Sequence, residues 1–233
     1  MLVIFSLVAS VWAGPVEDLV LAASKEGSEA QRMAAFERIV ALGSTDMARV
    51  SEVSQDDAAD ARQRWVAVRA LGQIKGDRAK NILIGLVADP MPAIRAASAS
   101  AMGDYGHADC VPYLVRLVQD PAVIVRAAAA TALNQSGDQR AVTVLSEALF
   151  DKKNTYRGRS IWVRKYFVEA LGGIGSAEAY PALLRSMDDP DEEVVARVIP
   201  ALEKIAGFSY SEGRTSKKET EAWRRFISNE LRR

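Results

Sequence analysis

The sequence has very few of the residues that most often build catalytic centres. Its 233 residues contain one cysteine, Cys110, and one histidine, His107. A single cysteine excludes an intrachain disulfide, and a single histidine excludes most zinc, haem and di-iron sites. The 30 basic residues are balanced by 30 acidic ones, whereas nucleic-acid-binding domains usually carry a basic excess. We therefore predict no catalytic residue, no metal and no cofactor, and we do not favour nucleic acid as a partner.

Long apolar runs are also scarce, and the one that occurs is N-terminal, where residues 1–15 read MLVIFSLVASVWAGP. About a dozen apolar residues are too few to span a bilayer as a helix. They suit a secretory signal peptide that is cleaved after Ala13. We predict a signal peptide at residues 1–13 and a periplasmic or secreted mature protein. Because no basic residue follows Met1, the alternative is a buried N-terminal helix in a cytoplasmic protein.

An internal repeat dominates the rest of the chain. The phrase DPMPAIRAASASAMGDYG at residues 89–106 returns 31 residues later as DPAVIVRAAAATALNQSG. An Ala-Leu or Ala-Met pair lies near the end of this phrase, and it occurs six times along the chain, at spacings of 29, 31, 31, 38 and 31 residues. The six pairs are Ala41-Leu42, Ala70-Leu71, Ala101-Met102, Ala132-Leu133, Ala170-Leu171 and Ala201-Leu202. Repeats of this length predict stacked units that share one continuous core.

Each repeat has the pattern of two helices joined by a turn. Cys110, Leu114 and Leu117 are spaced to lie on one face of a first helix. The turn follows at Asp120-Pro121, where we expect the aspartate to cap the second helix and the proline to begin it. Gly137, like Gly106 and Gly175 in other repeats, is expected to end the second helix in a left-handed conformation. The sequence thus predicts an all-α solenoid of about six helical pairs over residues 14–207.

This pattern resembles the HEAT repeats, and among them the short bacterial kind that also occurs in phycobilin lyases. The family pattern has a proline in the first helix, an aspartate in the turn and a basic residue six positions later, and Pro112, Asp120 and Arg126 match all three. The resemblance implies a right-handed superhelix. It also implies that the turn aspartates and the arginines form a structural ladder of ion pairs between repeats. We call this set the Asp–Arg ladder: Asp89, Arg95, Asp120, Arg126, Asp151 and Arg164.

The repeat ends near Gly207, and residues 208–233 form a polar linker followed by one more amphipathic segment. Its apolar stripe consists of Ala222, Trp223, Phe226, Ile227 and Leu231. We expect a helix that covers the last apolar face of the stack. A partner-binding helix is the alternative.

The lone histidine and cysteine both fit structural slots. His107 lies in the turn between two repeats, where a turn or cap role is expected. Cys110 occupies a slot that holds alanine in other repeats, namely Ala79, Ala141 and Ala179. We therefore expect a buried, inert thiol.

The 38-residue spacing contains a seven-residue insertion, in the segment DKKNTYRGRSIWVRK at residues 151–165. No acid follows Asp151 within it, and aromatic residues are interleaved with the cations. Such a loop suits phosphate, a carboxylate or an acidic protein surface. The candidate partner-binding residues are Lys152, Lys153, Tyr156, Arg157, Arg159, Trp162 and Lys165. The alternative is that the acidic turn DDPDEE at residues 188–193 of the next repeat neutralises the insertion.

Taken together, these features favour a non-catalytic, monomeric scaffold or adaptor that binds another protein. The alternative is an enzyme or enzyme subunit of the phycobilin-lyase type, which has no sharp catalytic motif to test. The di-iron hydroxylases of the HEAT family are excluded, because they need several His-Glu pairs and the single histidine here is followed by Ala108.

Overall fold

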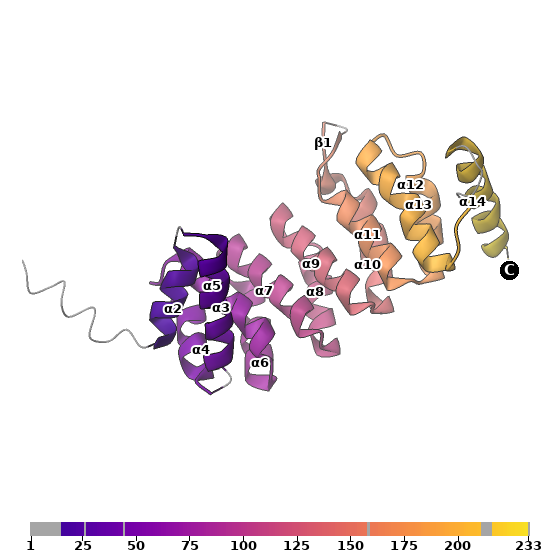
Figure 1. Cartoon of the computed structure of the whole chain (residues 1–233). Helices are drawn as coiled ribbons and strands as arrows, with labels where there is room; N and C mark the ends of the chain where they lie inside the picture. The colour runs from indigo at the N-terminus through magenta and orange to yellow at the C-terminus, as the bar shows by residue number, and fades with distance from the viewer. Residues whose placement is uncertain (1–14, 26, 44, 158, 211–215, 233) are drawn as a thin grey trace, which may run out of the picture. The chain divides into compact units, whose positions relative to one another are not determined.

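Two compact units of helices make up the protein. The computed structural model describes residues 15–25, 27–43, 45–157, 159–210 and 216–232 (Figure 1). Contacts within the chain divide it into unit 1, which ends at Tyr105, and unit 2, which begins at Gly106. Unit 1 contains α2 (Pro15–Ser24), α3 (Glu29–Gly43), α4 (Met47–Gln55), α5 (Ala61–Ile74), α6 (Asp77–Gly85), the 3₁₀ turn η1 (Leu86–Ala88) and α7 (Pro92–Tyr105).

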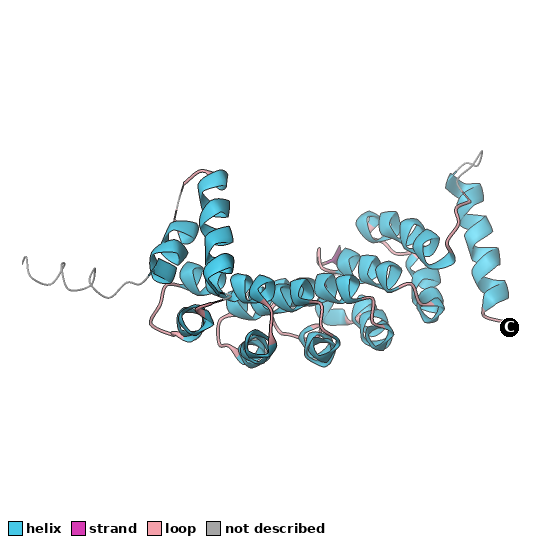
Figure 2. Ribbon diagram, turned by 60° about the horizontal axis from the view of Figure 1, so that its bottom comes forward, coloured by secondary structure: helices cyan, strands magenta, loops and turns pink. Residues whose placement is uncertain are grey.

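Unit 2 continues the same alternation and adds a short hairpin and a last helix. Its first half contains η2 (Ala108–Cys110), α8 (Val111–Leu117), α9 (Val123–Ser136), η3 (Gln139–Ala141) and α10 (Val142–Phe150). Its second half contains η4 (Lys152–Asn154), β1 (Thr155–Tyr156), β2 (Arg159–Ser160), α11 (Arg164–Ile174), η5 (Ala177–Ala179), α12 (Tyr180–Ser186), α13 (Glu192–Ala206) and α14 (Ser216–Glu230). The two strands pair with each other, and helices make up nearly all of the remaining regular structure (Figure 2).

The helices pack as the repeat predicts. In unit 1 the pairs are α2–α3, α4–α5 and α6–α7, and the second helices α3, α5 and α7 contact one another in sequence. In unit 2 the pairs are α8–α9, α10–α11 and α12–α13, and α11 packs against both α9 and α13. The prediction of an all-α solenoid with six helical pairs is therefore confirmed. The handedness of the superhelix stays a prediction.

Recurring leucines form the core of each pair. The first-helix slot holds Leu83, Leu114, Leu145 and Leu183, and all four side chains are buried. Burying one such side chain stabilises the fold by about 1.5–3 kcal/mol. Small residues then set how closely the second helices approach. A Cβ atom at Gly172 of α11 would lie only 2.6 Å from Cα of Ala201 in α13.

The turns differ in one respect from the sequence prediction. Asp120 does not cap α9, which begins at Val123 with Ala122 in the capping position. Its carboxylate instead accepts a hydrogen bond from the backbone N–H of Ala122 at 2.8 Å, as in an Asx turn. The prediction that the aspartate caps and the proline begins the helix was wrong, because an Asx turn uses the same Asp-Pro pair and precedes the helix.

The glycine prediction is confirmed at the other end of these helices. Gly137 and Gly175 have φ values of 62° and 75°, in the left-handed region where glycine is favoured. The N–H of Gly137 donates to the carbonyl of Leu133, and that of Gly175 to the carbonyl of Leu171. Gly106 also has a positive φ, of 70°, directly after α7.

The C-terminal helix covers the end of unit 2, as predicted. α14 packs against α12 and α13, and Trp223 and Ile227 are fully buried. The ring of Trp223 stacks on that of Phe208, with centroids 5.3 Å apart, and Phe226 meets Tyr180 edge to face. Leu231 is exposed and lies beyond the end of α14, so it does not belong to the buried stripe.

Within the described residues, no helix is both long enough and apolar enough to cross a membrane. The predicted signal peptide at residues 1–13 and its cleavage site lie outside the described residues.

Candidate functional site

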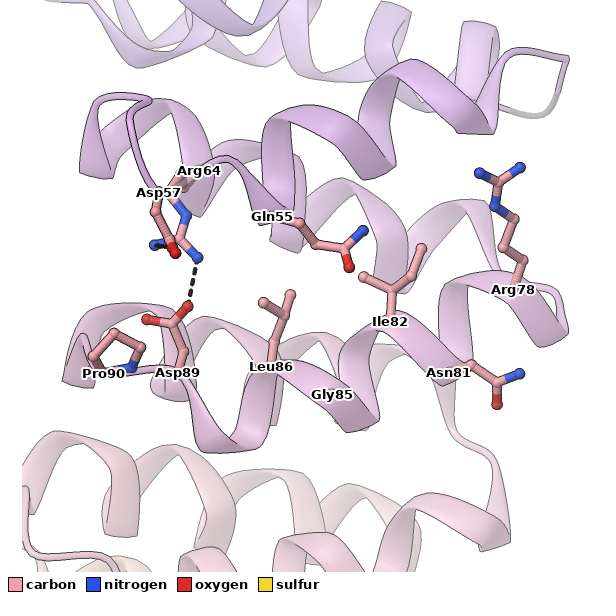
Figure 3. Close-up of a pocket in the computed structure, with 10 residues that line it drawn as sticks. All are labelled: Gln55, Asp57, Arg64, Arg78, Asn81, Ile82, Gly85, Leu86, Asp89 and Pro90. Carbon is pink, nitrogen blue, oxygen red and sulfur yellow. Dashed lines mark hydrogen bonds and ion pairs between the residues drawn. The ribbon is translucent and has the colours of Figure 1, made fainter.

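A polar groove lies in unit 1 between α4–α5 on one side and α6–η1 on the other (Figure 3). Its volume is about 690 Å³. Ile82 and Leu86 line its apolar part, and the Arg64 guanidinium pairs with the Asp89 carboxylate at one end. Arg78 lies toward the other end (Figure 3). The groove thus combines an apolar floor with a buried ion pair.

Unit 2 contains an equivalent groove of about 440 Å³. Arg164, Asp189 and Pro190 line it, each 100 residues after its counterpart in unit 1. Nη1 of Arg164 donates to Oδ1 of Asp189 at 3.0 Å, and both side chains are buried. Because the groove recurs with the repeat, we attribute its ion pair to the stacking of the helical pairs.

The arginines of the grooves also tie α5 and α11 to the C-terminal end of the preceding helix, α4 or α10. Nε of Arg164 donates to the carbonyl of Leu149 at 2.7 Å, and Nε of Arg64 donates to the carbonyl of Ser54 at 3.3 Å. Arg64 and Asp189 occupy the basic and acidic slots of the repeat, although neither is among the six residues of the predicted Asp–Arg ladder. Comparing residues 100 positions apart shows that the two ion pairs are equivalent.

The predicted ladder residues divide into two kinds of contact. Arg95 and Arg126 each donate to the backbone carbonyl of their own turn aspartate, at 2.8 Å. Burial lowers the pKa of the Arg126 guanidinium, while the nearby Asp120 and Asp151 carboxylates oppose that shift. Asp151 and Arg164 do not meet, because Arg164 reaches forward to the following turn. The structural role of the ladder stays a prediction.

The insertion forms the hairpin β1–β2 between α10 and α11, and β1 lies above α11 in Figure 1. Asn154 holds its base. The Asn154 side chain is fully buried, and its Nδ2 donates to the carbonyl of Ala148 in α10 at 2.8 Å. The backbone N–H of Ile161 donates to the carbonyl of Asn154 at 2.9 Å and closes the loop. Sequence reasoning missed Asn154, because a single asparagine in a polar loop carries no distinguishing pattern.

Two aromatic side chains of the insertion face solvent. Tyr156 is 66% exposed and Trp162 is 44% exposed. The Arg157 guanidinium lies over the Tyr156 ring, 5.3 Å from its centroid. Neither Lys152 nor Arg157 forms an ion pair with an acid among the described residues. All four residues are exposed, and we call them together the hairpin surface.

Two of the remaining predicted cations, Lys165 and Lys153, lie beside acidic side chains. Nζ of Lys165 lies 2.8 Å from Oε2 of Glu193, and this hydrogen bond raises the pKa of Lys165. Nζ of Lys153 lies 3.4 Å from Oδ2 of Asp151. A backbone hydrogen bond from Lys153 lowers the pKa of the Asp151 carboxyl. The backbone of Arg159 pairs with that of Tyr156. The acidic turn therefore contacts Lys165 and Arg164.

The lone histidine and cysteine have the environments that the sequence predicts. His107 caps η2, with its Nδ1 accepting from the N–H of Asp109 at 3.1 Å. Cys110 is fully buried. Over the part of the chain that the structure describes, no three His, Cys, Asp or Glu side chains are placed to hold a metal ion.

The paired helices and their recurring groove define an α-solenoid protein. The sequence model described as HEAT repeats matches residues 84–162 and 155–214, which together make up more than half of the chain. The model of the PBS lyase HEAT-like repeat matches residues 63–89. The chain therefore belongs to the HEAT-repeat family.

Solved structures give the same fold. The structure of the complex of CpcE and CpcF of phycocyanin lyase, from Nostoc sp. PCC7120, is 25% identical, with a TM-score of 0.59. The match covers 68% of this chain and 64% of that chain, so this chain spans less than two thirds of that relative.

Two further structures show the fold alone. An engineered protein is 21% identical over 82% of this chain and 89% of its own, with a TM-score of 0.52. YibA of Escherichia coli is 24% identical over 82% of this chain and 67% of its own, with a TM-score of 0.51. No curated protein sequence matched the chain.

Proposed function

We propose that this chain is a non-catalytic scaffold or adaptor that binds another protein through the hairpin surface of unit 2. The observation that carries this proposal is the joint exposure of Tyr156 and Trp162 beside cations that have no acidic partner among the described residues. Aromatic residues and arginine are enriched at the centres of protein interfaces. An exposed tryptophan and tyrosine on an insertion are therefore a natural anchor for a partner.

The hairpin surface is also restrained by contacts within the chain. Asn154 fixes its base to α10, and the edge-to-face contact between Trp162 and Tyr166, with centroids 5.7 Å apart, restrains the tryptophan. A restrained surface loses less conformational entropy on binding than a mobile one. The positive charge of Lys152 and Arg157 favours an acidic surface on the partner.

The test is affinity capture of the tagged mature protein from its native host, followed by mass spectrometry. The Lys152→Ala/Arg157→Ala double variant and the Trp162→Ala variant should lose the main captured partner. The Lys217→Ala/Lys218→Ala double variant removes the same charge from exposed positions of α14 and should retain it. Circular dichroism establishes that each variant is folded. Unchanged capture by both folded hairpin variants would rule out this surface.

The proposal extends to export. The apolar run of residues 1–13, followed by small residues, supports a cleaved signal peptide and a periplasmic or secreted protein. Intact-mass measurement of the native protein should give a chain that begins at or near Gly14. A mass that includes residues 1–13 would contradict export by this route.

A second candidate function is that of an enzyme subunit of the phycobilin-lyase type. The similarity to the phycocyanin lyase complex, at 25% identity over 68% of this chain, favours it. The discriminating measurement is the visible absorbance of protein purified from its native host. Co-purified bilin pigment in a fixed ratio to the chain would favour the lyase function, and a colourless preparation would favour the scaffold.

A further inference from the structure

A second, smaller cavity opens on the second-helix face of unit 2. It has a volume of about 180 Å³, and three successive second helices line it. Asn134 comes from α9 and Glu169 from α11, while Arg197, Pro200, Ala201 and Lys204 come from α13. Nη1 of Arg197 lies 3.2 Å from Oε1 of Glu169. The cavity is separate from the hairpin surface.

Glycines shape this cavity. A Cβ atom at Gly173 would lie 1.6 Å from Oδ1 of Asn134, so only glycine lets the asparagine side chain lie against α11. Gly172 allows α11 and α13 to approach at Ala201. The three helices are therefore close enough for their polar side chains to surround one small ligand.

The equivalent slots of unit 1 show what is special about this cavity. The position 100 residues before Glu169 is occupied by Arg69, and the position 100 residues before Lys204 is occupied by Asp104. Arg69 and Asp104 form an ion pair at 2.6 Å between α5 and α7. The charges at those slots in unit 1 thus neutralise each other.

Unit 2 reverses both charges and adds a third. Arg197 replaces the alanine found at position 97 of unit 1, and it pairs with the Glu169 carboxylate. Lys204 has no ion pair with any acid of the described residues. The cavity therefore holds two cations and one anion, and one positive charge remains available to a ligand.

Pro200, which lines the cavity, leaves one backbone carbonyl of α13 available as a hydrogen-bond acceptor. Pro200 lies inside α13 and has no backbone N–H. The carbonyl of Ala196, four residues earlier, consequently lacks its helical donor. Lys204, Arg197 and the Asn134 amide can donate to an anion, and the Ala196 carbonyl can accept an N–H. A peptide segment supplies both a carboxylate and backbone N–H groups.

We propose that this cavity binds a carboxylate carried by a peptide segment of another protein, held by Lys204 and Arg197 with Asn134 as an additional donor. The carboxylate comes from an acidic side chain or from the end of a chain, because both present the same two oxygens. This site goes beyond the hairpin surface and does not depend on it.

The test is a titration of the isotope-labelled chain with short peptides, followed by NMR. The first probe is acetylated trialanine with a terminal carboxylate, and the second is acetyl-Ala-Glu-Ala amide. Acetylated trialanine amide serves as the neutral control, and inorganic phosphate as the general anion. We expect the side-chain amide signals of Asn134 to shift saturably with at least one carboxylate peptide and not with the neutral control. Saturation by only one of the two carboxylate peptides identifies the source.

Variants make the assignment specific to Lys204. Lys204→Ala should weaken peptide binding at least tenfold, and Lys204→Arg should retain it. Lys217→Ala removes an exposed lysine of α14 as the matched control and should bind as the wild type does. The proposal is overturned if neither carboxylate peptide binds, if the neutral peptide or phosphate binds as tightly, or if Lys204→Ala has no effect. The purified chain is used alone, so failure here leaves the capture experiment on the hairpin surface unaffected.

Discussion

Replacing Gly172 by alanine tests the close approach of α11 and α13 directly. The added Cβ would lie 2.6 Å from both Cα and Cβ of Ala201, a distance that carbon atoms do not tolerate. The obstructing atoms belong to the backbone and to the shortest side chain of a neighbouring helix, so no rotamer change relieves the clash. The two helices must separate, and the buried contacts around Leu171 and Leu202 loosen with them.

The expected magnitude is a balance of two effects. Overpacking a well-packed core costs about 1–3 kcal/mol, whereas alanine is favoured over glycine inside a helix by about 1 kcal/mol. We expect the upper part of the overpacking range here, because backbone atoms are involved. The net result is a loss of about 1–2 kcal/mol in the free energy of unfolding.

Gly85 provides the matched control, with the opposite sign. It has helical backbone angles at the end of α6, and a Cβ atom there would meet nothing within 4 Å. Gly85→Ala should therefore stabilise the protein by up to about 1 kcal/mol. Urea unfolding followed by circular dichroism measures both variants. A Gly172→Ala midpoint at or above that of the wild type would refute the close approach of the two helices.

Three further predictions concern the core, the groove and the turns. Leu114→Ala should cost about 2–4 kcal/mol, because this buried leucine occupies the recurrent first-helix slot; an unmoved thermal midpoint would show that the face is misassigned. Asp189→Ala should cost about 3–5 kcal/mol, because it leaves the buried Arg164 unpaired. The control is its exposed neighbour Asp188, which pairs with Arg224 at 2.6 Å. Replacing Asp188 by alanine should cost less than about 1 kcal/mol, and equal losses in the two variants would contradict a buried pair at Asp189. The backbone hydrogen bond from Lys153 lowers the folded-state pKa of Asp151. The ionised Asp151 carboxylate therefore stabilises the fold above its unfolded-state pKa of about 3.9. This stabilisation is lost as the pH falls through the lower folded-state pKa. Asp151→Asn should reduce the pH dependence of the urea midpoint below about pH 4, and an unchanged profile would mean that other carboxylates determine it.

The repeat period made most of the fold predictable. Six Ala-Leu or Ala-Met pairs, spaced 29 to 38 residues apart, were enough to locate the second helix of each pair, because each helical pair must bury the same face against its neighbours. The starts of the helices were less predictable. Asp120 and Pro121 suit both a helix cap and an Asx turn, and only the three-dimensional path of the chain decides between them.

The candidate sites were predictable to a smaller extent. The insertion identified the hairpin surface, but the partners of its cations depended on how far each side chain reaches. Arg164 and Lys165 meet Asp189 and Glu193 of the following turn, whereas Lys152 and Arg157 do not. The cavity at Lys204 was not found from the sequence, because the sequence does not tell which cation pairs with Glu169; in the structure it is Arg197. Comparing equivalent slots of different repeats reveals that choice.

The same comparison separates the residues that build the stack from those available to a partner. Slots that keep their residue type between repeats, such as those of the Arg64–Asp89 and Arg164–Asp189 pairs, are the ones that we expect to serve the packing of each helical pair on the next. Slots whose residue type changes between repeats make the surfaces of the two units different. In unit 2, two features leave cations without acidic partners among the described residues: the insertion, and the reversal of charge at positions 169 and 204 relative to unit 1. The net charge of zero describes the chain as a whole and does not exclude local regions of positive charge. It argues against a uniformly basic surface for nucleic acid, and it is compatible with local positive sites that select an acidic protein.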